Sequence, residues 1–278
     1  MELRGIDIHT HVATEEALGE MAEMGAAFGT QVTGTRIEET VALYRSLEMM
    51  AVVFLIDRRT RGVPYLGNDY VANLVAPYPD TLIGFASVDP WMGARAVADV
   101  RVAITELGLR GVKFMPLTQE FYVDDRRFYP LWEEIASLRV PVIIHTGTTG
   151  VGAGSAGGGG VRLDFGRPVP HLDTLAADFP ELTIVAAHPG WPWHDELLAV
   201  MVHKTNVWMD LSGWSPRYLP ASVVQYASTL LQDRVLFGTD YPLLTPERWL
   251  RDFAEAPFKD AVRSKILVEN ARRLLAIP

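Results

Sequence analysis

The sequence of 278 residues contains no cysteine. This absence excludes disulfide bonds, a catalytic thiolate and any metal centre that is ligated by cysteine sulfur. A metal ion bound to this protein would therefore need histidine, aspartate or glutamate ligands.

Positive charge and long apolar runs are also scarce. The chain has 25 Lys and Arg against 34 Asp and Glu, a net charge of −9, and its densest basic run is only Arg58, Arg59 and Arg61. Such a chain repels a phosphate backbone. No segment approaches the roughly 18 consecutive apolar residues of a membrane-spanning helix, and the N-terminus lacks the apolar core of a secretory signal. We expect a soluble, cytoplasmic protein without nucleic-acid or membrane partners.

The composition that is present, 49% hydrophobic and 21% charged, is typical of a folded chain with a large core. Eight short apolar segments, bounded by Gly, Pro or Asp, alternate with segments of helical periodicity. The expected strands are 5–12, 50–56, 82–90, 111–116, 141–147, 182–190, 207–213 and 235–242, and the expected helices are 37–48, 94–107, 128–138, 170–179, 193–203, 219–231 and 258–275.

This alternation indicates parallel strands joined by right-handed crossovers, and the solidly apolar strands suit a sheet that is covered on both faces. We predict an α/β protein with a (β/α)₈ barrel as a single domain over residues 1–278. An open, doubly wound sheet is the alternative. The longest loops are expected at 13–35 and at the glycine-rich segment 147–160, which is either a lid over the site or a disordered surface loop.

Histidine and aspartate residues stand at the ends of several expected strands. His9 and His11 close the first strand, His145 the fifth, His188 the sixth and Asp240 the eighth. Because a parallel barrel brings the carboxyl ends of all its strands to one rim, these five side chains should converge. Each alone could be a hydrogen-bonded core residue. Together they form a nitrogen and oxygen donor set for one divalent metal, zinc in the first place and manganese or iron as alternatives.

The first strand carries polar residues at alternate positions. Side chains alternate between the two faces of a strand, so Asp7, His9 and His11 should share one face while Ile6 and Ile8 face the helices. Asp7 could then orient one of the two imidazoles through a hydrogen bond.

Further candidates follow the expected strands. Trp191, Trp214 and Tyr241 could form a flat apolar wall for a planar substrate, with Trp91 and Trp193 as weaker candidates. Three arginines are possible carboxylate partners or plain surface charges, and three histidines are expected at the surface: Arg162, Arg167, Arg217, His171, His194 and His203.

The chain resembles the amidohydrolase superfamily in several motifs. These are Asp-x-His-x-His at 7–11, the single histidines on later strands, Gly-Thr-Asp-Tyr-Pro at 238–242, Gly-Val-Lys-Phe at 111–114 and Glu-Asn-Ala-Arg at 269–272. The resemblance spans nearly the whole chain. It is strongest to the branch that includes aminocarboxymuconate semialdehyde decarboxylase and the resorcylate-type decarboxylases.

The resemblance implies specific roles for the strand-end residues. His9, His11, His145 and Asp240 would ligate one catalytic metal, and His188 would be an unligated acid or base next to it. Asp240 could also take part in proton transfer.

Lys113 stands on the fourth expected strand, where some superfamily members carry a carboxylated lysine between two metals. The branch resembled here is mononuclear, so we expect Lys113 to bind a substrate carboxylate or to form a structural ion pair.

Two reactions fit the resemblance. The preferred one is non-oxidative decarboxylation of a small aromatic or unsaturated carboxylic acid, and the alternative is hydrolysis of a lactone, ester or amide by metal-activated water. A barrel that binds a metal or ligand without catalysis is a third interpretation. The expected partner is a small planar acid or lactone, and a homodimer is expected because relatives of this kind commonly form dimers.

Overall fold

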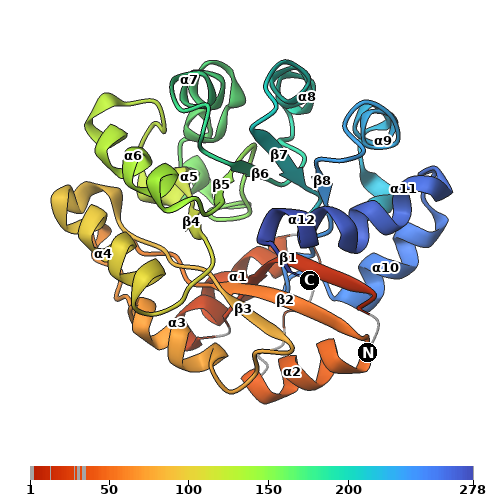
Figure 1. Ribbon diagram of the computed structural model, residues 1–278, viewed down its shortest axis with the longest axis horizontal. Coiled ribbons are helices and arrows are strands. Elements are labelled where there is room, and N and C mark those ends of the chain that lie inside the picture. The colour runs from red at the N-terminus through yellow and green to blue at the C-terminus, as the bar shows by residue number, and fades with distance from the viewer. Residues whose placement is uncertain (1–2, 13, 28, 30–31, 33–35, 278) are drawn as a thin grey trace.

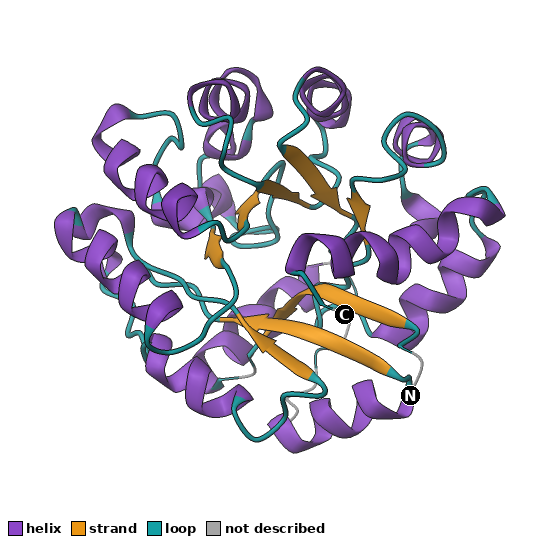
Figure 2. Ribbon diagram, viewed as in Figure 1, coloured by secondary structure: helices purple, strands orange, loops and turns teal. Residues whose placement is uncertain are grey.

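The computed structural model describes residues 3–12, 14–27, 29, 32 and 36–277, and eight parallel strands form its centre. Figure 1 shows the strands ringed by helices, and Figure 2 shows the same division by secondary structure. The strands are β1 (Gly5–His11), β2 (Met49–Phe54), β3 (Leu82–Gly84), β4 (Val112–Phe114), β5 (Val142–His145), β6 (Ile184–Ala187), β7 (Val207–Asp210) and β8 (Val235–Leu236).

The strands pair in sequence order, β1 to β3 in one sheet and β4 to β8 in another. Backbone hydrogen bonds join the two sheets at both seams. The amide of Lys113 donates to the carbonyl of Ala86 at 2.7 Å, and the amide of His11 donates to the carbonyl of Tyr241 at 2.8 Å. The (β/α)₈ prediction is confirmed, and the open doubly wound alternative is not.

Helices surround this ring in the described residues. They are α1 (Glu15–Ala27), α2 (Ile37–Ser46), α3 (Asn68–Val75), α4 (Ala94–Thr105), α5 (Pro116–Gln119), α6 (Tyr129–Leu138), α7 (Asp173–Asp178), α8 (His194–His203), α9 (Ala221–Ala227), α10 (Pro246–Glu255), α11 (Asp260–Ser264) and α12 (Asn270–Leu275). Within the described part of the chain, no helix combines the length and the apolar character needed to cross a bilayer.

Three helices of eight or more residues were not anticipated from the sequence, and neither was the four-residue α5. Residues 13–35 were expected to form a loop, but α1 occupies much of that segment, whose Ala, Glu, Met and Leu content favours helix. Residues 13, 28, 30–31 and 33–35 lie outside the described residues. The others are α3 and α10. Thr245 caps the amino end of α10, because its hydroxyl accepts a hydrogen bond from the Arg248 amide, and Pro246 is the first helical residue.

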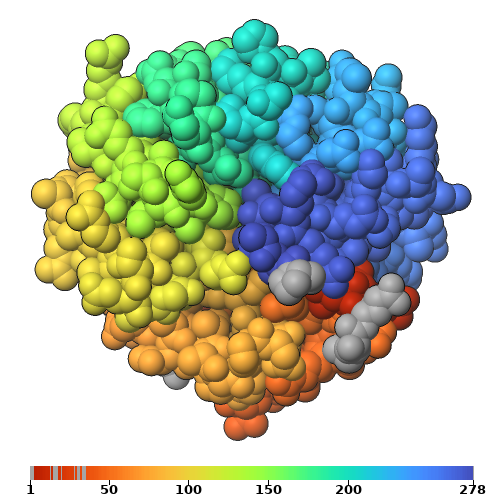
Figure 3. Space-filling view, in the orientation of Figure 1, coloured from red at the N-terminus to blue at the C-terminus, as the bar shows by residue number. Residues whose placement is uncertain are grey.

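The apolar core forms two layers. Val142 and Ile144 of β5 pack with residues of the surrounding helices, whereas Ile143 between them packs with residues of β1, β2, β3, β6 and β8. The second cluster therefore fills the inside of the ring. It also contains Ala271 and Leu275 of the C-terminal segment, and Figure 3 shows this segment in the middle of one face of the molecule, beside the N-terminal residues. The amino end of the barrel is thus plugged by apolar side chains.

Ile6 and Ile8 belong to this inner cluster, so the expected facing of β1 was wrong. The pairing of β1 with β2 shifts register between Asp7 and Thr10, which marks a β-bulge or similar irregularity. A bulge interrupts the strict alternation of side chains. Consequently Ile8 and His9, although adjacent, both belong to the inside of the barrel.

Asp7 therefore does not hold an imidazole. Its buried carboxylate accepts hydrogen bonds from the Tyr44 hydroxyl of α2 at 2.6 Å, from the Thr239 hydroxyl at 2.6 Å, and from the backbone amides of Thr239 and His9 at 3.0 and 3.1 Å. Burial raises the pKa of the Asp7 carboxyl to about 7, and these four hydrogen bonds oppose that shift. Asp7 ties the first strand to the segment after the last strand.

We predict that Asp7→Asn lowers the free energy of unfolding by about 3 kcal/mol. The NH₂ group of the asparagine would face the hydroxyl and amide donors that now bind the buried carboxylate of Asp7. Urea unfolding measures this loss. Asp80→Asn is the matched control, since the Asp80 side chain is 59% exposed and pairs with Arg45 at the surface, where an ion pair contributes less than about 1 kcal/mol. Equal losses in the two variants would contradict the role assigned to Asp7.

Candidate metal centre and active site

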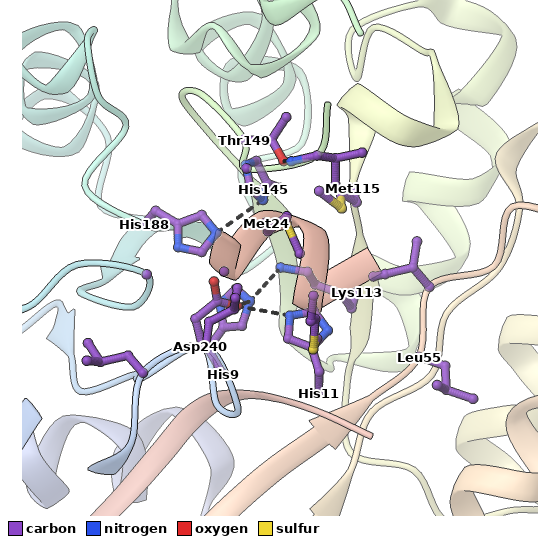
Figure 4. Close-up of a pocket in the computed structure, with 18 of the residues that line it drawn as sticks. His9, His11, Met24, Leu55, Lys113, Met115, His145, Thr149, His188 and Asp240 are labelled. Carbon is purple, nitrogen blue, oxygen red and sulfur yellow. Dashed lines mark hydrogen bonds and ion pairs between the residues drawn. The ribbon is translucent and has the colours of Figure 1, made fainter. Parts of the chain in front are cut away.

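A cavity of about 790 Å³ opens at the carboxyl ends of the strands. The predicted strand-end residues His9, His11, His145, His188 and Asp240 all line it, together with Lys113. Figure 4 shows these side chains gathered in one place. They come from five strands or strand ends, those of β1, β4, β5, β6 and β8. The convergence expected of a parallel barrel is thus present in the structure.

Three of these residues form a compact group of metal-binding type. The Nε2 atoms of His9 and His11 lie 3.4 and 3.0 Å from the Oδ1 atom of Asp240. Although burial alone would raise the pKa of Asp240, the hydrogen bond from His11 and the charges of nearby histidines hold it well below its usual range. Two imidazole nitrogens and an ionised carboxylate are donors that a divalent cation accepts.

Asp210, at the end of β7, is a functional residue that the sequence analysis missed. Its Oδ2 atom accepts a hydrogen bond from Nδ1 of His9 at 3.1 Å, and its Oδ1 atom accepts from the Ser212 hydroxyl and from the His188 amide. Because Asp210 accepts a hydrogen bond from the protonated Nδ1 of His9, the lone pair of His9 lies on Nε2, which faces the cavity and can bind a cation there. The available signal was a polar residue ending an apolar strand, as at the histidines.

A second group of candidate ligands consists of His9, His188 and Asp210. In this group Asp210 is fully buried, and both of its oxygens already accept hydrogen bonds. Asp210 is therefore placed to orient the imidazole of His9 through a hydrogen bond at the nitrogen that does not face the cavity. The group of His9, His11 and Asp240 is therefore the better metal site.

His145 and His188 face one another, with His145 Nδ1 3.1 Å from His188 Nε2. Their other nitrogens lie 2.9 and 3.0 Å from backbone carbonyl oxygens of Thr148 and Ser212, which can only accept. Each neutral ring therefore points a lone pair at the other. A proton shared between the two rings would relieve this repulsion of lone pairs. Burial lowers the pKa of both imidazoles, however, so protonation of either ring is costly. A cation near this pair would satisfy the lone pairs, which fits the predicted ligand role of His145.

His188 and Asp240 both have left-handed backbone, with φ of 69° and 70°. Such conformations are uncommon outside glycine and concentrate at functional sites. Gly213 makes room beside them, because a Cβ atom there would come within 2.8 Å of His188 Nδ1. The local backbone thus serves the placement of the two side chains.

Lys113 is fully buried in the cavity floor. Its ammonium lies 3.2 Å from His9 Nε2 and 5.0 Å from the centre of the Phe54 ring. Burial lowers the pKa of Lys113 to about 8, against the opposing charges of Asp210 and Asp240. A buried ammonium that faces a cavity is suited to an anionic ligand group.

The expected aromatic wall is present in part. Trp191 and Trp214 line the cavity with their ring centres 6.0 Å apart. Tyr241 instead lies buried in the core, edge-on to Tyr44, outside the cavity lining that the described residues form. Trp91 packs on Phe128 and, like Trp193, is not among those lining residues.

The expected arginines and surface histidines lie away from the cavity lining in the described part of the chain. Arg162 pairs with Asp164 and Arg167 with Glu196, while Arg217 lines a separate groove beside α9 and α10. Two other arginines, Arg58 after β2 and Arg248 in α10, line the cavity instead. The remaining histidines stand outside it: His171 (paired with Asp124), His194 and His203.

The glycine-rich segment 147–160 contributes its first half to the cavity. Thr148, Thr149, Gly150 and Val151 are lining residues, whereas Ala156–Gly160 forms a short turn of 3-10 type. The lid function stays a prediction.

Known proteins resemble this chain in sequence and in fold. The family model described as Amidohydrolase matches residues 6–277. The gamma-resorcylate decarboxylase of Polaromonas sp. is 25% identical in an alignment of 279 positions that covers 86% of this chain and 83% of that protein.

Two solved structures are similar over nearly their whole lengths. An uncharacterized TIM-barrel protein of Bordetella bronchiseptica has a TM-score of 0.84 at 26% identity, covering 99% of both chains. A dihydroxybenzoic acid decarboxylase of Polaromonas sp., solved with bound manganese and the inhibitor 2-nitroresorcinol, has a TM-score of 0.71 at 20% identity, covering 99% of this chain and 97% of that one. At 20% identity, the similarity to the Polaromonas structure shows a shared fold and nothing more.

We predict that His11→Ala weakens binding of the divalent metal by at least about 100-fold, because a direct ligand matters more than its supporting partners. Metal content after dialysis, measured by atomic emission, reports the loss. His188→Ala should retain the metal, and His171→Ala is the control outside the cavity. Loss in His188→Ala with retention in His11→Ala would assign the metal to the other candidate group.

A second prediction concerns Asp210. Asp210→Asn should weaken metal binding by about 10- to 100-fold, because the amide no longer fixes the tautomer of His9. Competition with a chelator of known affinity measures the change. Asp173→Asn, at the start of α7 and paired with Lys204, is the matched control and should leave the metal affinity unchanged. An unaltered affinity in Asp210→Asn would remove Asp210 from the supporting role.

Proposed function

The chain belongs to the amidohydrolase family, and on this premise we propose that it is a divalent-metal-dependent, non-oxidative decarboxylase of an aromatic carboxylic acid. The observation that carries the proposal is the joint placement of a metal-type donor group, a facing histidine pair and a buried ammonium in one cavity with an aromatic wall. The relative from Polaromonas sp. acts as a gamma-resorcylate decarboxylase by its name, which supports the same reaction class.

His9, His11 and Asp240 would hold the metal, with His145 as the fourth ligand. The nitrogen-rich donor set favours zinc, and manganese is the alternative because the similar Polaromonas structure contains it. When bound, the cation supplies positive charge that holds anionic oxygens of the substrate.

Lys113 binds and orients the carboxylate of the substrate. Its ammonium lies within the cavity beside His9, and an ammonium forms strong charge-assisted hydrogen bonds with carboxylates. Trp191 and Trp214 face the ring of the substrate and exclude water from that side.

His188 and Asp240 pass on a proton that they take up from solvent water, because neither carries one on its cavity-facing atom at rest. The ring carbon that bears the carboxylate gains a proton, the bond between that carbon and the carboxylate breaks, its electron pair stays with the ring, and carbon dioxide leaves. His188 is suited to the transfer because its Nε2 atom faces the cavity, while Ser212 holds the ring at Nδ1 and Asp210 accepts a hydrogen bond from the backbone amide of His188.

The reaction is tested with the metal-loaded protein and a panel of hydroxybenzoic acids and aromatic lactones in ¹⁸O-labelled water. We expect one carbon dioxide per acid consumed and no labelled oxygen in any lactone product. Lactone opening with incorporation of label, and without carbon dioxide from any acid, would replace decarboxylation by hydrolysis. Metal binding without turnover of either class would favour a non-catalytic barrel.

We further predict that His188→Gln lowers kcat for carbon dioxide release by about 100- to 10,000-fold, the usual contribution of a proton-transfer group. The metal content of the variant should stay near that of the wild type. His203→Gln, at the end of α8 and outside the cavity lining, serves as the control. If kcat in His188→Gln stays within twofold of the control, the proton must come from another group.

A further inference from the structure

The cavity is larger than a single substituted benzoic acid requires. Its volume of about 790 Å³ lies in the upper part of the roughly 300–1,000 Å³ range of pockets that enclose drug-sized ligands. A lone ring with a carboxylate would leave much of that space unfilled, and lining atoms without partners lose their dispersion contacts. The volume therefore points to a substrate with a substantial extension.

The lining beyond the polar cluster is apolar. Met21 and Met24 of α1, Leu55 after β2 and Met115 after β4 contribute side chains to it, and Figure 4 shows Met24, Met115 and Leu55 around the histidines. Methionine side chains are unbranched and adapt to irregular apolar shapes. Such walls suit a flexible hydrocarbon better than a second rigid ring.

The apolar lining continues to the surface. Leu66, Trp191 and Tyr218 all line the cavity, yet they are 53%, 46% and 63% exposed. Exposed large apolar side chains that rim a pocket are typical of a site that an apolar ligand covers. The apolar surface therefore extends from the metal-type cluster outward to the solvent.

We propose that the substrate is an aromatic carboxylic acid whose ring carries an unbranched alkyl chain of several carbons. The ring and its carboxylate lie at Lys113 and the histidines, and the chain lies along the methionines toward Leu66. This inference rests on the proposed function, because it assumes that the polar cluster takes the carboxylate end of an aromatic acid.

Two arginine side chains in the cavity lining suggest an alternative ligand, whose chain ends in a carboxylate. Arg248 lies 3.9 Å from the carboxylate of Asp252, and Arg58 follows β2. A chain that ended in a second carboxylate would pair with such groups. The alkyl proposal therefore predicts that a terminal methyl group is preferred to a terminal carboxylate on a chain of equal length.

The test uses 2-hydroxy-6-alkylbenzoic acids with methyl, propyl, pentyl and heptyl chains on the metal-loaded protein. We expect kcat/KM to rise by about fourfold for each buried methylene, the factor that corresponds to about 0.8 kcal/mol. Equal values along the series, a decrease with length, or a preference for the chain with a terminal carboxylate would overturn the proposal.

Matched variants locate the chain. Leu66→Glu places a charge at the cavity rim and should abolish the dependence of kcat/KM on chain length. Leu230→Glu makes the same change at a leucine that is 72% exposed and outside the described cavity lining, and it should keep the dependence. Circular dichroism verifies that both variants fold. Retention of the dependence in Leu66→Glu would reject the assigned path.

A binding measurement separates this inference from the proposed reaction. Calorimetry with 3-alkylphenols of the same chain lengths requires no turnover. Tighter binding with length, without carbon dioxide from any acid, would support the apolar subsite and reject decarboxylation. Carbon dioxide from 2,6-dihydroxybenzoate, with neither rates nor affinities depending on chain length, would support decarboxylation and reject the subsite.

Discussion

Mutual compensation of buried ionisable groups is the constraint on which the candidate site depends. Asp240 lies between the imidazoles of His9 and His11, Asp210 supports His9 from behind, and Lys113 adds a buried positive charge. Each of these groups alone would be costly to place in a low-dielectric interior, and removing one leaves its partners uncompensated. The same arrangement presents lone pairs and anionic oxygens to the cavity, which is why a divalent cation fits there.

The barrel and the site are joined by the irregularity in β1. The register shift between Asp7 and Thr10 lets Asp7 face the helices while His9 enters the barrel interior next to Ile8. Asp7 then binds Tyr44 and Thr239, which ties the first strand to the end of the eighth. The hydrogen bonds that close the ring therefore also set the distance between the histidines of β1 and Asp240.

The cavity has two chemically distinct parts. The inner part, with His145, His188 and Lys113, suits an anionic group and a proton transfer. The outer part, which includes the side chains of Met24 and Leu66, offers apolar contact. Because reaction chemistry and substrate size are set by different residues, a common family reaction can be combined with an individual substrate preference.

Much of this protein was predictable from its sequence because the signals were local. Apolar runs ending in His or Asp predicted the parallel strands, the common rim and five cavity residues. A strand bulge, by contrast, leaves no periodic signal, so the facing of Ile8 and the true partners of Asp7 were misjudged. Asp210 gained its role only when folding brought it to His9, 201 positions away in the chain. The helix α1, the placement of Tyr241 in the core and the cavity arginines Arg58 and Arg248 were likewise decided by the tertiary structure, because contacts between distant segments determine which side chains face the cavity.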